Sequence, residues 1–437
     1  MTPHIQTSSR GRRLPRSTVA LVLALLATTA AGCSLVGGDS DAAEPKGDPA
    51  FTVAAAGDIL IHPQLTEQAY RDAGVTEVPE AVGKKVGADV ADPDFGPIMA
   101  GVKPVVSKAD LAICHFEPVV AGPKGPFRSF PDFLVPPQIT TAIKETGYDT
   151  CSTASNHTLD DGVGGVNRTL GALDAAGLKH TGSARSAAEG AKPLIVDVKG
   201  VRVAQLSYAF GFNGREIPAG KPWITNPNSF DAIASAEKAA RKAGAEAVIL
   251  SIHWGREHHP DPSASQLKLG RRIAKETGID LVIGHHAHVV QPMEKVAGTW
   301  IAYGLGNQLA RHDVPSGLTE EGVIGWFEFH KKSGGGGGWD VEARYVPTFV
   351  TIPPEDQEDQ EDQGGEGGTG GTGSDAGDAG AATDHRLLDI AGALRADKDL
   401  SVEERAQYRL AFERTRGTML NRGASKDGLR PLNDLPD

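Results

Sequence analysis

The sequence predicts an α/β fold in which helices cover sheets, with a short helical tail at the C-terminus. Short apolar runs such as 247–252 and 281–283 are typical of buried strands. Helix-length stretches lie between several of these runs and stop at a glycine, as 166–176 does before Gly177. Strands that alternate with helices in this way favour a layered α/β core.

The remaining predicted elements continue this alternation along the chain. The other strands are the runs 51–56, 111–114, 194–198 and 201–206, and the other glycine-stopped helices are 137–146 and 263–277. Runs at 323–330 and 341–350 flank a Gly-rich loop, which predicts a late hairpin. Ser401 and Glu404 have the spacing of a capping box, which predicts a helix running towards Thr418.

Composition divides the chain into five parts. They are a signal peptide at 1–32, a small polar tether at 33–50, the main domain at 51–352, an acidic low-complexity linker at 353–383 and a helical tail at 384–437. The linker repeats Glu-Asp-Gln and then becomes Gly/Asp/Ala-rich, so it buries too little apolar surface to order itself. The tail either packs back on the main domain or stands apart from it.

Charge and motif content exclude two functional classes. The formal net charge of −12 argues against nucleic acid as a partner. Most of that charge lies in the segment 355–384, so it describes the linker and not a binding site. The sequence has no Gly-x-x-x-x-Gly-Lys-Ser/Thr motif, which excludes an ATP-dependent ligase.

The N-terminus has the features of an export signal with a lipid anchor. Basic residues precede an apolar run at 17–31, which is too short to span a membrane comfortably. The run ends in Ala-Ala-Gly-Cys at Ala30 to Cys33, which resembles a bacterial lipobox, although that pattern prefers Leu where Ala30 stands. An ordinary secretory signal cleaved nearby is the alternative. We predict a protein held at the extracytoplasmic face of the cell membrane by lipid on Cys33.

Two further cysteines remain once Cys33 is assigned to the anchor. Cys114 and Cys151 form an even pair in a compartment expected to be oxidising, and each lies near the end of a predicted strand. Both a disulfide and two buried thiols fit this pattern.

Metal-competent side chains follow five of the predicted strands. In chain order they are Asp58, His115 with Glu117, Asn156 with His157, His253, and the group His285, His286 and His288. Because ligands bind beyond the carboxyl ends of the strands in α/β sheets, we expect these residues to converge on one rim. Imidazole suits Zn, Fe and Mn, and carboxylates can bridge two ions. The set predicts a pair of divalent ions that activate water for hydrolysis.

Each of these features alone has a simpler explanation. An Asp after a strand is most often a helix cap or a turn residue. A single His is more often a hydrogen-bonded surface or core residue. His286 and His288 are the strongest single signal, because alternating residues of a strand place both rings on one side. Their joint occurrence at equivalent strand ends favours a shared site.

Five segments resemble those of the CapA family of capsule or poly-γ-glutamate synthesis proteins, in order and spacing. They are AAGDIL, ADLAICHFEPVV, ASNHTLDDGVGGVNRTL, SIHWGREHHPDPSASQLKLGRRIA and GIDLVIGHHAHVVQPMEKVAGTWIAYGLGNQ, within 51–345. That family's domain is similar to calcineurin-like metallophosphatases, which implies a β-sandwich flanked by helices. The implied ligands are Asp58 for the first ion, Glu117 as a bridge, Asn156, His253 and His286 for the second ion, and His288 for the first. His157 is implied as the general acid, oriented by Asp160.

Three positions depart from the family pattern, and one of them is His285, which stands where the family usually has a small residue. His115 stands where the family commonly has Asn, so it either adds a ligand or replaces a hydrogen bond. The phosphatase pattern Asp-x-His is absent after Asp58, and His62 is the candidate to fill the vacant position.

Two classes of function stay open. The first is a metal-dependent hydrolase that uses Mn, Zn or Fe and cleaves phosphoester or amide bonds in an envelope polymer or its precursor. The second is a non-catalytic accessory subunit of a membrane complex for polymer synthesis or export, with a structural or vestigial metal site. The intact ligand set favours the hydrolase.

Overall fold

The computed structural model describes residues 50–80, 82–312, 316–332, 338–353, 384–396 and 398–436. The predicted signal peptide with Cys33, nearly all of the tether and nearly all of the acidic linker lie outside these residues. Within the described ranges, no helix combines the length and apolar character needed to cross a membrane.

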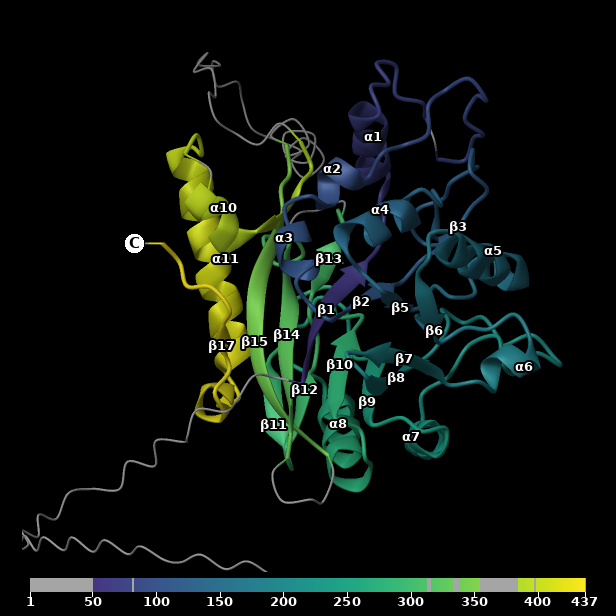
Figure 1. Cartoon of the computed structure of the whole chain (residues 1–437). Coiled ribbons are helices and arrows are strands. Elements are labelled where there is room, and N and C mark those ends of the chain that lie inside the picture. The colour runs from purple at the N-terminus through teal and green to yellow at the C-terminus, as the bar shows by residue number, and fades with distance from the viewer. Residues whose placement is uncertain are drawn as a thin grey trace, which may run out of the picture. The chain divides into compact units, whose positions relative to one another are not determined.

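Two sheets form the centre of the fold (Figure 1). Within the described residues, the larger sheet comprises β16 (Leu387–Asp389), β15 (Trp339–Val350), β14 (Glu321–Lys331), β1 (Phe51–Ile59), β2 (Leu111–Phe116), β5 (Thr150–Ser152) and β6 (Lys179–Thr181), with β13 (Asn307–Leu309) beside β1 and β17 (Arg430–Pro431) beside β15. The smaller sheet has the order β11 (Met293–Val296), β12 (Thr299–Ala302), β10 (Leu281–His285), β9 (Ala247–His253), β8 (Val201–Ala209) and β7 (Leu194–Val198). A short ribbon pairs β3 (Val119–Val120) with β4 (Leu134–Val135).

The two sheets pack face to face through an apolar core. Val53 and Ile113 of the larger sheet and Ile249 and Ile283 of the smaller sheet belong to this core. Successive residues of a strand point to opposite faces, so Ala54, next to Val53, packs under the outer helices instead. This arrangement is a sandwich of two sheets, as in other sheet-on-sheet folds.

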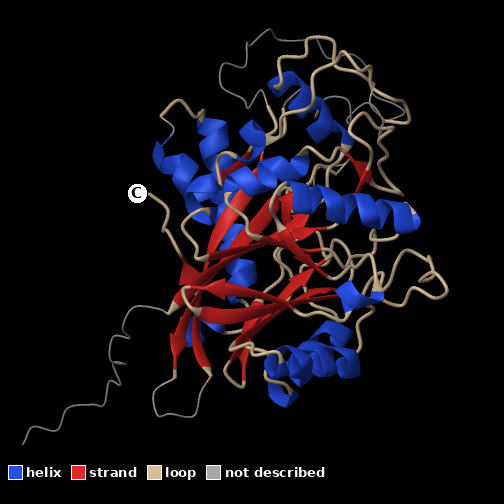
Figure 2. Ribbon diagram, turned by 45° about the vertical axis from the view of Figure 1, so that its right-hand side comes forward, coloured by secondary structure: helices blue, strands red, loops and turns tan. Residues whose placement is uncertain are grey.

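Helices cover the outer faces of both sheets (Figure 2). The larger sheet is covered by α1 (Pro63–Asp72), α2 (Gly96–Met99), α3 (Lys103–Val106), α4 (Ile139–Thr146) and α5 (Gly162–Ala175). The smaller sheet is covered by α7 (Phe230–Lys242) and α8 (Ala264–Glu276), and α6 (Ala187–Gly190) precedes β7. Gly147 ends α4 with a φ of 115°, a left-handed conformation that glycine adopts readily. The predicted α/β sandwich flanked by helices is confirmed.

The C-terminal tail packs on the larger sheet. It forms α10 (Ile390–Ala396), α11 (Val402–Leu420) and the short 3₁₀ turn Ala424–Asp427. Ser401 and Glu404 make the expected capping box at the start of α11. Tyr408 and Phe412 of α11 pack against Phe349 of β15, while β16 and β17 both pair with β15. The tail and the main domain therefore share one sheet.

A disulfide joins two neighbouring strands of the larger sheet. Cys114 of β2 and Cys151 of β5 are directly opposite in the parallel register. Their sulfur atoms are bonded, and their Cα atoms are 4.5 Å apart. The structure thus selects the disulfide over two separate thiols, and the bond fixes β5 beside the strand that carries His115.

Candidate metal centre

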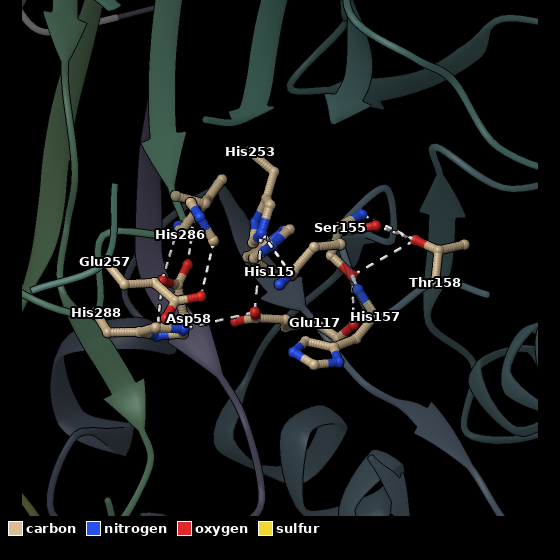
Figure 3. Close-up of polar contacts among 12 residues, drawn as sticks. Asp58, His115, Glu117, Ser155, His157, Thr158, His253, Glu257, His286 and His288 are labelled. Carbon is tan, nitrogen blue, oxygen red and sulfur yellow. Dashed lines mark hydrogen bonds and ion pairs between the residues drawn. The ribbon is translucent and has the colours of Figure 1, made fainter. Parts of the chain in front are cut away.

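Six side chains meet where the two sheets come together, three from each sheet (Figure 3). The contributions are Asp58 in β1, Glu117 after β2 and Asn156 after β5 from the larger sheet, and His253 in β9 with His286 and His288 after β10 from the smaller sheet. In the parallel register Asp58 pairs with His115, and His253 pairs with His285. The predicted convergence therefore joins the strand ends of two sheets and not of one.

Glu117 lies at the middle of this group and is fully buried. Its Oε1 is 3.8 Å from Nε2 of His253 and 3.6 Å from Nε2 of His288. Neither carboxylate oxygen has a hydrogen-bond partner, and burial raises the pKa of Glu117 well above its usual value. A buried carboxylate without hydrogen bonds is costly unless a cation balances it. Its position between two imidazoles suits a ligand that bridges two ions.

Asp58 joins the same group from β1. Its Oδ2 accepts the backbone N–H of His286 at 2.9 Å and lies 3.4 Å from Nδ1 of His288. Its Oδ1 is 3.2 Å from Nδ1 of His285 and has no hydrogen bond. Burial raises the pKa of Asp58. This buried oxygen is a second acceptor that a cation would satisfy.

Neighbouring side chains set the orientation of the imidazoles. His288 donates from Nδ1 to Oδ1 of Asn307 at 2.9 Å, which leaves Nε2 directed at Glu117. Nδ1 of His253 lies 3.0 Å from Nε2 of His115, which leaves Nε2 of His253 facing Glu117 and Oδ1 of Asn156. Partners that fix the second ring nitrogen in this way are typical of histidine ligands.

Both ring nitrogens of His115 are engaged by neighbouring side chains. Its Nδ1 is 2.8 Å from Oγ of Ser152, and its Nε2 is 3.0 Å from Nδ1 of His253. Its ring stacks on His285 at 4.0 Å between centroids. It also belongs to a group with Asp58 and His253 whose ligand atoms lie within 4.8 Å of one another. The hydrogen bonds make it a positioning residue for His253.

His62 contacts backbone groups instead of the metal ligands. Its Nδ1 accepts the backbone N–H of Arg311 at 3.1 Å and also lies 3.1 Å from the carbonyl of Leu60. None of the candidate metal groups found among the described residues includes it. The structure therefore does not bring His62 into the vacant Asp-x-His position.

His157 and Asp160 form a buried pair beside the ligands. Nδ1 of His157 is 2.6 Å from Oδ2 of Asp160, and the same oxygen accepts the backbone N–H of Phe133 at 2.8 Å. Asn213 links the pair to the ligand group, because its Nδ2 lies 3.4 Å from Nδ1 of His157 and its Oδ1 accepts from Nδ2 of Asn156 at 3.2 Å. With Nδ1 held by the carboxylate, Nε2 of His157 is the nitrogen available to a substrate.

The imidazoles are held in the neutral state that metal binding requires. Burial lowers the pKa of His286 to about 3 and holds that of His253 well below its usual value. The pKa of His288 is also lowered, mainly by burial. Because a protonated imidazole cannot bind a metal, these lowered values keep the nitrogen lone pairs free near neutral pH.

His286 and His288 reach the centre through left-handed backbone. Their φ angles are 91° and 53°, and both residues follow the last residue of β10. Neither residue is in a strand. The prediction that strand alternation places the two rings on one side is therefore wrong. Non-glycine residues in this conformation cost about 1–3 kcal/mol each and cluster at functional sites.

The ligand atoms form two overlapping groups, each of which could hold a metal ion. One group of ligand atoms is Asp58, Glu117 and His288, and another is Glu117, His253 and His286, each with its atoms within 4.8 Å of one another. Both groups contain Glu117, as expected of a bridging carboxylate. Oxygen and nitrogen donors together suit Mn, Zn or Fe.

Sequence reasoning gave no role to three residues at this centre. Asn307 orients His288, Asn213 contacts Asn156, and Glu257 shares a candidate metal group with His286 and His288. Asn307 and Glu257 both lie in segments that carry the family resemblance. Their partners are far away in sequence, so local pattern could not assign them.

Known proteins resemble this chain to different degrees. It is 28% identical over 269 residues to PGA biosynthesis protein CapA of Bacillus subtilis (strain 168), covering 60% of this chain and 66% of that protein. It is 31% identical over 169 residues to capsule biosynthesis protein CapA of Bacillus anthracis, covering 38% and 41%. A probable polyglutamine synthesis accessory protein of Mycobacterium tuberculosis is 27% identical over 266 residues, with 57% and 69% covered.

Solved structures give a weaker likeness. Calcineurin-like phosphoesterase YfkN from Bacillus subtilis matches with a TM-score of 0.38 and 14% identity, over 68% of this chain and 90% of that one. A 5′-nucleotidase precursor from Thermus thermophilus matches with a TM-score of 0.36 and 14% identity, over 67% and 54%. At TM-scores this low, nothing about this chain rests on the likeness.

The profile of one protein family matches residues 52–312, more than half of the chain. This span contains every residue of the candidate metal centre, from Asp58 to Asn307. The chain therefore belongs to the family described as bacterial capsule synthesis protein PGA_cap.

Proposed function

We propose that this protein is a metal-dependent hydrolase of phosphoester or amide bonds in a cell-envelope polymer or its precursor. The observation that carries the proposal is Glu117, a buried carboxylate without hydrogen bonds among neutral imidazoles, with the His157–Asp160 pair beside it. The names of the Bacillus relatives point to capsule or poly-γ-glutamate-type polymers as the class of substrate.

The residues divide the work of hydrolysis between them. Asp58, Glu117, Asn156, His253, His286 and His288 would hold the ions, which when bound supply a hydroxide at neutral pH and stabilise charge on the reacting oxygens. Asp160 keeps the Nδ1 proton of His157 in place. His157 can then give a proton from Nε2 to the leaving group, a contribution of about 10²–10⁴-fold to the rate.

The second candidate is a non-catalytic accessory subunit of a polymer synthesis or export complex. The printed name of the Mycobacterium tuberculosis relative, an accessory protein, favours it. In that case the ions would stabilise the contact between the two sheets without turnover.

One experiment separates these candidates. The full chain, purified without chelators, is analysed for bound metal and then incubated with a panel of phosphoesters and γ-glutamyl peptides. We expect Mn, Zn or Fe at up to two ions per chain and turnover of at least one member of the panel. Bound metal without any turnover supports the accessory subunit, and a chain that binds no divalent ion contradicts the metal centre itself.

We also propose that the protein is anchored at the extracytoplasmic face of the membrane through lipid on Cys33. The basic residues, the apolar run 17–31 and the Ala-Gly-Cys ending support this. Several acyl chains anchor stably where one binds only marginally. Cys33→Ser should move the protein to the soluble fraction, whereas the control Ser34→Ala should stay with the membrane. Retention of Cys33→Ser, with no lipid mass on the mature terminus of the parent protein, would show that the anchor is elsewhere.

A further inference from the structure

Glu257 brings a third carboxylate to the metal centre from the solvent side. It lies on the loop that follows β9, and its side chain is 48% exposed. Its Oε1 is 3.9 Å from Nδ1 of His286. The ligand atoms of Glu257, His286 and His288 all lie within 4.8 Å of one another. Figure 3 shows the Glu257 carboxylate beside these two rings.

The nitrogen that faces Glu257 is available for a new partner. Nδ1 of His286 is buried and has no hydrogen bond, and the whole residue is only 5% exposed. His288 is also buried, and its Nδ1 is engaged by Asn307. A buried nitrogen without a hydrogen bond is unfavourable unless another group satisfies it.

The loop that carries Glu257 is tied to the segment that carries the two histidines. The backbone N–H of His258, the next residue, donates to the carbonyl of Ala287 at 2.7 Å. The carbonyl of His259 accepts from Nε2 of Gln291 at 2.8 Å. These bonds tie the two residues that follow Glu257 to the segment that carries His286 and His288. The proximity of Glu257 to the two histidines is therefore a feature of the fold.

We propose that Glu257 is a further metal ligand, which reaches the ion held by His286 from the solvent side. A carboxylate and an imidazole are both common ligands of a divalent ion that keeps positions open to water or substrate. Glu117 serves the same ions from the buried side, so the imidazoles lie between an interior and an exterior carboxylate. The inference rests on the metal centre of the proposed function and not on its hydrolytic activity.

Exposure gives Glu257 a role that the other ligands cannot have. Glu117 and Asp58 are almost fully buried, with exposures of 0% and 1%. They can therefore release a bound ion to solvent only if the site opens. Glu257 is half exposed and can move away without disturbing the core. Its loss should therefore act mainly on how fast the ion leaves, while the fold stays intact.

The test compares two variants of the full chain on the same loop. Glu257→Gln keeps the size of the side chain and removes its negative charge. Asp261→Asn is the matched control, because Asp261 is exposed on this loop and belongs to none of the metal groups found among the described residues. Zn²⁺ and Mn²⁺ affinity is measured by calorimetry, and ion release is followed after addition of a chelator.

We expect Glu257→Gln to weaken ion binding by about tenfold or more and to speed release correspondingly. Asp261→Asn should match the parent protein, and both variants should share its thermal midpoint in the presence of chelator. Equal affinity and release for Glu257→Gln and the parent protein would overturn the proposal while leaving the metal centre standing. A parent protein that binds neither ion would overturn the metal centre and this inference together.

Discussion

The larger and smaller sheets supply different chemistry to the same centre. The larger sheet contributes oxygen donors, the carboxylates of Asp58 and Glu117 and the amide of Asn156. The smaller sheet contributes imidazole nitrogens, from His253, His286 and His288. Each of the two groups that share Glu117 takes ligands from both sheets, so the candidate pair of ions needs both.

Burial also shifts the pKa values of the carboxylates and of the imidazoles in opposite directions. Burial favours the neutral form of every group in the centre, so it raises the pKa of Glu117 and lowers that of His253. A bound cation requires ionised carboxylates and neutral imidazoles. It would therefore overcome the cost of burial in the oxygen half and use the state that burial already imposes in the nitrogen half.

The largest expected effect comes from removing one donor from either half. His286→Ala deletes a nitrogen ligand, and Glu117→Gln deletes the charge of the bridging oxygen ligand. Both should lower the bound metal per chain towards zero, measured by elemental analysis after dialysis. His180→Ala is a control, because His180 pairs with Asp174 outside the centre. Full metal content in His286→Ala would show that His286 is not a ligand.

The next effect separates metal binding from proton transfer. His157 holds no ion in the proposed arrangement, so His157→Ala should keep the metal content of the parent protein, while its thermal midpoint falls because buried Asp160 loses a partner. Turnover of any substrate found in the panel should fall by about 10²–10⁴-fold, because the leaving group loses its proton donor. The steady-state rate measures this loss, and an unchanged rate would remove His157 from the mechanism.

A smaller effect, on stability alone, tests what holds the oxygen half in place. The disulfide joins Cys114 and Cys151 across β2 and β5 and closes a loop with a sequence separation of 37. Replacing both cysteines by alanine should lower the free energy of unfolding by roughly 2–4 kcal/mol. Urea denaturation of the two proteins measures the change. If the midpoints coincide, packing alone holds these strands together.

The smallest expected effect is on the pH dependence of folding stability, which has opposite signs for the imidazoles and for the carboxylates. An unfolded histidine takes up a proton near pH 6.5, whereas folded His286 has its pKa lowered to about 3. Between these values only the unfolded chain gains the proton, so the metal-free fold should lose stability as the pH falls below 6.5. For Glu117, whose pKa burial raises, stability is present at low pH and is lost as the pH rises through the folded value.

Added Mn²⁺ should reverse the loss of stability with rising pH that we expect from Glu117. Metal binding displaces protons from its ligands, so the stabilisation by Mn²⁺ should grow as the pH rises and vanish in acid. Thermal midpoints measured with chelator and with Mn²⁺, between about pH 5 and pH 8, give both curves. Because Glu117 acts with the opposite sign, the contribution of the imidazoles is the difference between the metal-free parent protein and metal-free His286→Ala. The same pH dependence in both proteins below pH 6.5 would contradict the assignment of the imidazoles.

Local pattern predicted the elements of this fold well. The apolar runs 194–198 and 247–252 correspond to β7 and β9, and the capping box at Ser401 begins α11. These features depend on side-chain periodicity and on caps within a few residues, which a single stretch of sequence contains. The residue types of the centre also followed from the sequence, because Asp, Glu and His after strands are visible without a structure.

The tertiary structure alone decided how these residues combine. It placed the donors on two sheets, joined Cys114 to Cys151, engaged His62 with the backbone of Arg311 and packed the tail against β15. It also brought Glu257 to His286. Each of these contacts depends on how elements distant in sequence pack and register, and side-chain periodicity within one element carries no information about that. The sequence by itself determined which ligands exist, and the packing of the two sheets determined which of them can share an ion.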